Sequence, residues 1–146
     1  MKKRVFGKKL SRSRTAREAL YRSLFRSLVV HGAITTTETK AKALTRYADK
    51  IVGTAKEDSL ESRRRVVARL ANDDETAKAV FEKIAPMYKR KSGFTRITPL
   101  PKRRGDNTKT AKVEWVKKAS SSDSEKTTSK KKTASKDDKK KQAKSK

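Results

Sequence analysis

Hydrophobic residues first recur with helical spacing between Thr15 and His31. Two parallel rows repeat every four residues and together make one broad apolar face: Leu20, Leu24 and Leu28 in one row, and Tyr21, Phe25 and Val29 in the other. Thr15 and Glu18 have the spacing of a capping box, which predicts that a helix begins there. Gly32 follows His31 and can adopt the left-handed conformation that ends a helix.

The next pattern is short and rich in β-branched residues. Residues 33–37 predict a strand that runs into a helix cap at Thr36 or Thr37. We expect the following helix to reach about Lys56. Its apolar positions share one face and are Ala41, Leu44, Ala48, Ile51, Val52 and Ala55.

Two shorter helices are expected next. Asp58 with Glu61, and Asn72 with Glu75, have the spacing of N-terminal capping pairs. Pro86 is expected to stop the second helix, because proline lacks the N–H of a helical hydrogen bond. The apolar positions are Leu60, Val66, Val67 and Leu70 in the first of these helices, and Ala77, Val80, Phe81 and Ile84 in the second.

After Pro86 the pattern changes to that of a hairpin. Residues 94–98 read as a strand, and residues 111–115 alternate apolar and charged side chains, which predicts a second strand with one buried face. The connection carries a basic tip at residues 102–104. Trp115 could stack on a base, but its place in the alternation favours the core.

Composition divides the chain into one small domain and two charged extensions. The hydrophobic residues concentrate between residues 16 and 116, enough for one modest core. Residues 1–14 have no periodicity and are expected to form an extended basic arm, and residues 15–116 the globular domain. Residues 117–146 are rich in Lys, Ser and Thr and are expected to be a disordered tail.

The charge is strongly positive, with 42 Lys+Arg against 16 Asp+Glu and a formal net charge of +26. Residues 1–30 contribute +9, residues 31–116 contribute +9 and residues 117–146 contribute +8. A polyanion is therefore the expected partner. No stretch approaches the ~20 apolar residues of a membrane span, and no apolar segment follows the basic N-terminus, so a cytoplasmic location and no membrane partner are expected.

Catalytic chemistry is not indicated. The chain has no Cys and one His, and its carboxylates do not cluster in an apolar setting, so neither a nucleophile with its base nor a metal site is apparent. We expect no enzymatic activity, no cofactor, no metal and no small-molecule substrate. His31 lies at a helix end, where a role in capping or in an RNA contact is a better interpretation than a catalytic role.

The candidate RNA-binding residues are the cations of the arm, of the first helix and of the stretch between residues 89 and 104 that contains no acid. They are Lys2, Lys3, Arg4, Lys8, Lys9, Arg12, Arg14, Arg17, Arg22, Arg26, Lys89, Arg90, Lys91, Arg96, Lys102, Arg103 and Arg104. Arginine forms bidentate bonds to phosphate and lysine supplies a mobile charge. For Arg46, Lys50, Lys56 and Lys78 an ordinary solvated helix surface is the better interpretation.

Several motifs in order resemble the bacterial large-subunit ribosomal protein seventeen family. They cover residues 1–116 and comprise Gly7-Lys8-Lys9-Leu10, Arg17 before Ala19-Leu20, Ile34-Thr35-Thr36-Thr37-Glu38, Phe81-Glu82-Lys83-Ile84-Ala85-Pro86-Met87-Tyr88, Gly93-Phe94-Thr95-Arg96-Ile97 and Arg103-Arg104-Gly105-Asp106. The sequence departs from the family pattern at Lys2-Lys3, Ala16 and Phe94, and its 30-residue tail is longer than is typical.

The resemblance implies an α+β fold, a small domain of about four helices packed on a short sheet. It also implies a structural role in the large ribosomal subunit, bound to large-subunit ribosomal RNA near the peptide exit tunnel, with neighbouring ribosomal proteins as partners. Two other functions stay open at this point. A nucleoid-associated, DNA-compacting protein is favoured by the Lys-rich tail, whereas an RNA-modifying enzyme or its accessory subunit lacks a candidate catalytic group.

Overall fold

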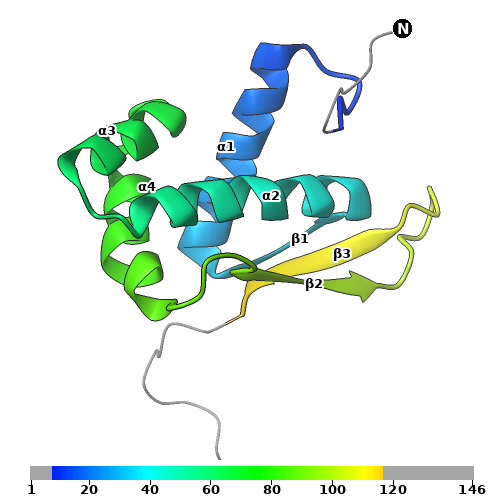
Figure 1. Cartoon of the computed structure of the whole chain (residues 1–146). Helices are drawn as coiled ribbons and strands as arrows, with labels where there is room; N and C mark the ends of the chain where they lie inside the picture. Colours follow the sequence, from blue (N-terminus) through cyan, green and yellow to red (C-terminus); the bar gives the residue numbers. More distant parts are fainter. Residues whose placement is uncertain (1–7, 117–146) are drawn as a thin grey trace, which may run out of the picture.

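The computed structural model describes residues 8–116, and the predicted tail lies outside that range, as do the first seven residues of the predicted arm. The chain forms α1 (Arg14–His31), β1 (Ala33–Thr37), α2 (Glu38–Ala55), α3 (Leu60–Arg69), α4 (Asp74–Ala79), a π-helical turn (Val80–Ile84), a 3-10 turn (Ala85–Met87), β2 (Thr95–Leu100) and β3 (Thr110–Trp115). Within the described residues, four α-helices thus accompany one three-stranded sheet, which confirms the predicted α+β class (Figure 1).

The sheet is antiparallel with the strand order β1-β3-β2. β3 pairs with both neighbours, so that Val113 lies between Ile34 and Ile97. Side chains alternate across the sheet, and the buried face of β3 carries Ala111, Val113 and Trp115, as the alternation predicted. β2 begins one residue later than expected, at Thr95, and extends to Leu100. It is an edge strand, where Pro99 costs little because its missing N–H faces away from β3.

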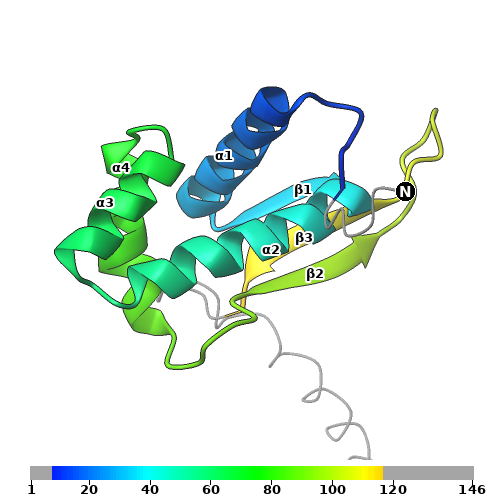
Figure 2. The same ribbon diagram turned by 45° about the horizontal axis from the view of Figure 1, so that its top comes forward.

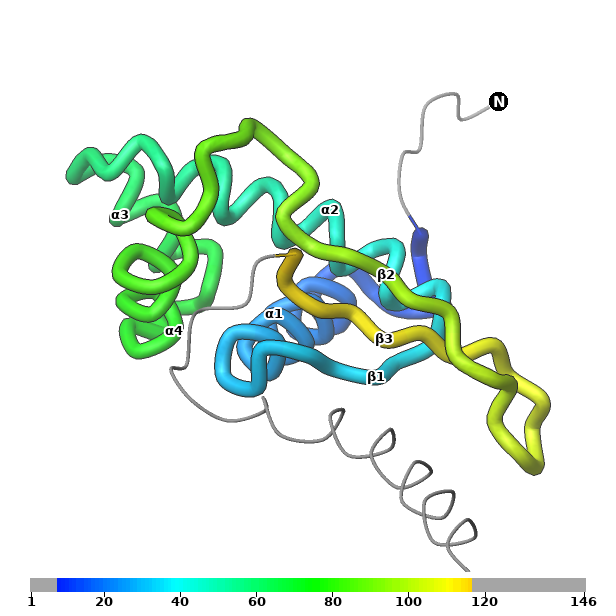
Figure 3. The backbone as a smooth tube through the Cα atoms, turned by 90° about the horizontal axis from the view of Figure 1, so that it is seen from below, coloured from blue at the N-terminus to red at the C-terminus, as the bar shows by residue number. Residues whose placement is uncertain are grey.

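α2 crosses the buried face of the sheet and joins it to the other helices (Figures 1 and 2). Its six predicted apolar positions are all buried. They meet Phe25 and Leu28 of α1, which are fully buried, and the Trp115 indole donates to the carbonyl oxygen of Leu28 at 3.1 Å. Trp115 is therefore a core residue. Figure 3 shows the opposite face of the sheet, which no described helix covers.

The predicted cap of α1 is confirmed at its C-terminus and is wrong at its N-terminus. Gly32 has φ +72° and its N–H donates to the Leu28 carbonyl, as predicted for a left-handed C-terminal cap. The predicted capping box of Thr15 and Glu18 is wrong. Ser13 is the N-terminal cap, since its hydroxyl accepts from the N–H of Ala16.

The predicted caps of α3 and α4 are wrong by one residue. Ser59 accepts from the N–H of Ser62, and Asp73 accepts from the N–H of Thr76. The residues before these caps, Asp58 and Asn72, have φ values of 41° and 62°. They serve the reversals between helices, so neither has the extended backbone that a capping residue normally needs.

Two further predictions about the short helices need correction. Leu60 is 67% exposed because it is the first residue of α3 and points away from the core, whereas Val66 and Leu70 are buried. The regular part of α4 ends at Ala79, seven residues before Pro86. The chain widens into a π turn in which the Ala85 N–H donates to the Val80 carbonyl, and Pro86 lies inside the following 3-10 turn.

Candidate nucleic-acid interface

The described end of the basic arm turns back toward the domain. Leu10 and Ser11 both have positive φ, and the N–H of Arg12 donates to the Lys9 carbonyl at 3.2 Å. The Tyr21 hydroxyl of α1 donates to the carbonyl oxygen of Lys8 at 3.3 Å. These contacts use backbone atoms, so they fix the path of the arm and leave its cationic side chains exposed.

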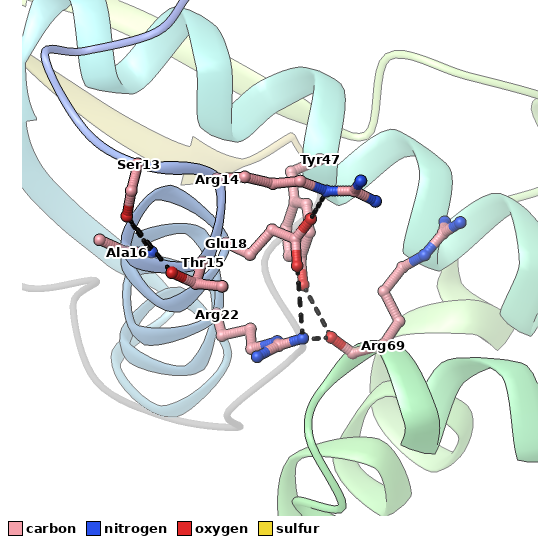
Figure 4. Close-up of polar contacts among 8 residues, drawn as sticks. All are labelled: Ser13, Arg14, Thr15, Ala16, Glu18, Arg22, Tyr47 and Arg69. Atoms are coloured by element: carbon pink, nitrogen blue, oxygen red, sulfur yellow. Dashed lines mark hydrogen bonds and ion pairs between the residues drawn. The ribbon is translucent and has the colours of Figure 1, made fainter.

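Two of the candidate arginines on α1 contact partners inside the protein (Figure 4). Glu18 lies 3.2 Å from Arg14 and 3.9 Å from Arg22. Arg22 Nε also donates at 3.0 Å to the carbonyl oxygen of Arg69, which accepts a second hydrogen bond from the Tyr47 hydroxyl at 3.1 Å. Burial raises the pKa of Tyr47, against the effect of the nearby arginine charges, so this hydroxyl remains a donor. Arg22 therefore joins α1 to the end of α3.

Arg26 connects α1 to α4. Its Nε lies 3.5 Å from Asp73, the residue that caps α4. Burial raises the pKa of Asp73, but the hydrogen bonds from Thr76 and the charge of Arg26 together hold it below its usual value. Arg17, by contrast, makes no ion pair among the described residues and is only partly exposed.

The basic residues before β2 lie on a braced turn. The Lys56 ammonium, just beyond α2, donates to the carbonyl oxygens of Lys89 at 3.2 Å and Arg90 at 2.7 Å. The Arg90 guanidinium lies over the ring of Tyr88, 5.4 Å from its centroid. The side chains of residues 89–91 are exposed around this fixed backbone. Lys56, expected to be an ordinary surface lysine, thus positions a candidate RNA contact.

The hairpin tip projects from the other end of the sheet (Figures 1 and 3). Arg103 donates to Asp106 through Nε at 3.1 Å, and this bond, with those from Thr108, holds the pKa of Asp106 well below its usual range. Lys102 and Arg104 are exposed and make no ion pair within the described residues. The pair at Arg103 gives the loop a fixed shape, while its two neighbours keep their charges available.

Arg96 occupies the outer, uncovered face of the sheet. Its Cα is paired across the ladder with Glu114, which also lies 3.0 Å from Lys112. Arg96 thus has an acidic cross-strand neighbour, unlike the cations at the hairpin tip.

The fold brings the end of the arm, the start of α2 and the base of the hairpin together around Glu38. Its N–H donates to the Lys109 carbonyl at 3.1 Å, and its carboxylate accepts from Lys42 at 2.5 Å. The Lys42 hydrogen bond and charge, with smaller contributions from Lys109 and Lys8, hold the pKa of Glu38 below its usual value. The arm and the hairpin therefore share one end of the molecule, and residues 89–91 lie at the opposite end of β2.

The fold also gathers cations of α2, among them Arg46 and Lys50, for which the sequence favoured an ordinary solvated surface. Lys42, Arg46 and Lys50 lie on α2 at four-residue spacing and line an open hollow of about 300 Å³ together with Tyr21 and Tyr47. The spacing is visible in the sequence. The position of α1, which brings Tyr21 to the hollow, is not.

Within residues 8–116, no three His, Cys, Asp or Glu side chains gather as they would to hold a metal ion. In the same range, no helix combines the length and the hydropathy needed to cross a bilayer. Lys2, Lys3 and Arg4 lie outside the described residues, so their predicted RNA contacts stay predictions.

Comparison with known proteins identifies the family. The model of the family described as ribosomal protein L17 matches residues 20–116, which is more than half of the chain and includes every helix and strand after the first part of α1.

Curated relatives named large ribosomal subunit protein bL17 match over most of their length. The protein of Sulfurihydrogenibium sp. (strain YO3AOP1) is 43% identical over 119 residues, covering 80% of this chain and 98% of the relative. That of Dictyoglomus thermophilum is 46% identical over 117 residues, covering 80% and 100%. That of Thermus thermophilus is 42% identical over 113 residues, covering 76% and 95%. The chain therefore belongs to the ribosomal protein L17 family, as its motifs predicted.

Proposed function

We propose that this protein is a structural constituent of the bacterial large ribosomal subunit that binds and braces large-subunit ribosomal RNA. Family membership supports the ribosomal role and a location in the cytoplasm, in the ribosome. The finer position, near the peptide exit tunnel and beside other large-subunit proteins, rests on the family resemblance alone.

One observation carries the proposal of RNA binding: the described end of the arm and the hairpin present exposed cations at the same end of the folded domain. Lys8, Lys9 and Arg12 lie on the arm, and Lys102 and Arg104 lie on the hairpin; all five are exposed, and none makes an ion pair among residues 8–116. Contacts of this kind neutralise phosphates and fix orientation without reading sequence. A fixed arrangement of cations suits RNA that is recognised by its shape.

Charge reversal on these two elements tests the proposal. We expect K102E/R104E and R12E/R14E/R17E to reduce incorporation into large subunits, measured by quantitative mass spectrometry of gradient fractions. R64E/K78E reverses charge on exposed positions of α3 and α4 and should incorporate normally. Surface changes of this kind typically alter stability by less than about 0.5 kcal/mol, so the melting temperatures should stay close to that of the parent. Normal incorporation of both test variants into large subunits would contradict the proposal.

A further inference from the structure

The hollow beside α2 combines cationic and aromatic side chains. It is bounded by the end of the arm, by α1 and by α2, and has a volume of about 300 Å³. Lys8, Lys42, Arg46 and Lys50 supply four cations, and Tyr21 and Tyr47 supply two aromatic rings.

The cations of the hollow are largely uncompensated. Among residues 8–116, the pair between Lys42 and Glu38 is the only ion pair that these four side chains make. The neighbouring carboxylate of Asp49 points away, toward β2, where its Oδ1 accepts from the N–H of Phe94 at 3.2 Å. Successive cations on α2 are four residues apart and so rise about 6 Å along the axis. They form a row that an extended anionic strand can follow.

The two tyrosine rings are held in place by contacts that leave ring surface, rather than hydroxyl groups, for a ligand. Their centroids are 5.7 Å apart and their planes are inclined by 39°. The Tyr21 hydroxyl already donates to the Lys8 carbonyl, and the Tyr47 hydroxyl to the Arg69 carbonyl. Phe25 packs edge-on against Tyr47 at 5.9 Å, which fixes that ring against the core.

The volume of the hollow and the chemistry of its side chains together indicate which ligand it binds. The volume lies at the lower end of the range for small-molecule sites, about 300–1,000 Å³, and suits a single nucleotide better than a folded RNA helix. Unpaired bases stack on aromatic side chains while their phosphates lie in a basic groove. A nucleotide can use both features of the hollow at once, with its phosphates on the cations and its base on the rings. We propose that this hollow binds an unpaired nucleotide of RNA, with its base against Tyr21 and its phosphates along Arg46 and Lys50.

This site rests on the proposed RNA-binding function and adds a requirement for single-stranded RNA at one defined place. It also gives the arm a second role. Because the Lys8 backbone is bonded to Tyr21, the end of the arm forms one wall of the hollow, and Lys8 adds a cation there.

The charge row is tested by binding of the full chain to a single-stranded octanucleotide and to an RNA hairpin of matched length, over a range of salt concentrations. R46Q/K50Q should flatten the log–log dependence of octanucleotide affinity on salt by about 1.4, since each single-strand phosphate contact contributes about 0.7. R64Q/K78Q removes the same charges from α3 and α4 and should leave that slope unchanged. Equal slopes for the two variants would overturn the site.

The ring is tested with a conservative pair. Tyr21→Leu should weaken octanucleotide binding at least about fivefold, because stacking on an aromatic ring contributes about 1–3 kcal/mol per base. Tyr21→Phe keeps the ring but loses the hydroxyl bond to the Lys8 carbonyl, so it should bind more tightly than Tyr21→Leu and less tightly than the parent. A 4-thiouridine in the octanucleotide should crosslink to the peptide that contains Tyr21 or Tyr47.

The outcomes separate this site from the general function. Crosslinks confined to other peptides, or equal loss for the two Tyr21 variants, overturn the nucleotide site while RNA binding stands. If the parent chain binds neither the octanucleotide nor the hairpin, the proposed function itself fails. Circular dichroism of each variant confirms that the domain remains folded.

Discussion

A single carbonyl group, that of Arg69 at the end of α3, is shared by α1 and α2. It accepts from Arg22 at 3.0 Å and from Tyr47 at 3.1 Å (Figure 4). The last carbonyls of a helix have no partner within the helix, so this arrangement satisfies one of them with side chains from two neighbours. Arg22 was a candidate RNA contact, and its bond to Arg69 gives it a structural role as well.

Removing both donors, Arg22 and Tyr47, should lower the free energy of unfolding by more than the sum of the two single losses. Tyr47→Phe alone should lower the free energy of unfolding by about 1 kcal/mol, the usual value of one hydrogen bond. R22M should have a similar effect, because in each single variant the other donor still serves the carbonyl. The double variant should exceed the sum by at least about 0.5 kcal/mol in urea denaturation.

Tyr21→Phe supplies the matched control for this cycle. It removes the hydroxyl bond to the Lys8 carbonyl and leaves the Arg69 carbonyl untouched. Its effect should therefore add to that of R22M without coupling. Strict additivity of Tyr47→Phe with R22M would show that the shared carbonyl does not link the three helices.

At the scale of helices and strands, the sequence predicts those features that follow from a periodic pattern of apolar residues. The apolar face of α2 and the alternation in β3 are confirmed residue for residue, because burial of one face demands a repeat that is visible locally. The left-handed end of α1 at Gly32 is confirmed for the same local reason. The relation of β1 to the hairpin was not predictable, since pairing between residues 33 and 114 depends on the whole chain.

The helix starts show the limit of local reasoning. At each of the three wrongly predicted caps, two polar residues that favour this role lie within two positions of each other, as Ser13 does with Thr15 and Asp58 with Ser59. The choice depends on which residue has extended backbone, and the preceding reversal decides that. The hollow beside α2 was missed for a related reason, because its walls come from three separate segments.

The cap of α4 predicts a dependence of stability on acid. The pKa of Asp73 is lowered from its ordinary value of 3.8, so the ionised form stabilises the folded domain above that pH, and this contribution is lost as the pH falls through the lower folded value. Asp73→Ala should cost about 1 kcal/mol at pH 7 through loss of the cap. Asp73→Asn should cost less, because asparagine also caps a helix.

The diagnostic measurement is thermal unfolding between pH 5 and pH 2. Both Asp73 variants should lose less stability over this interval than the parent, although some loss should persist because Glu38 and Asp106 also have lowered pKa values. Asp74→Asn changes the next residue, which is exposed, and should retain the acid response of the parent. If Asp73→Asn loses as much stability between pH 5 and pH 2 as the parent does, groups other than Asp73 cause the acid sensitivity.

For the whole molecule, the formal charge of +26 is divided almost equally among residues 1–30, 31–116 and 117–146. Ion pairs within the domain use several of the candidate cations, among them Arg14, Arg26 and Arg103. Among residues 8–116, the cations of the arm and hairpin that make no ion pair lie at one end, and residues 89–91 present a second basic site at the other end of β2. We expect such a molecule to hold separate RNA segments at a fixed distance.

The central claim is that the protein is held by large-subunit ribosomal RNA rather than by nucleic acid in general. The most direct measurement is sedimentation of the full chain through high-salt gradients with ribosomal subunits and duplex DNA present together. We predict that the protein cosediments with the large subunit and leaves the DNA as salt rises, because fitted contacts persist after the nonspecific ones are screened. A protein that is washed off the large subunit yet retained on DNA would contradict the account.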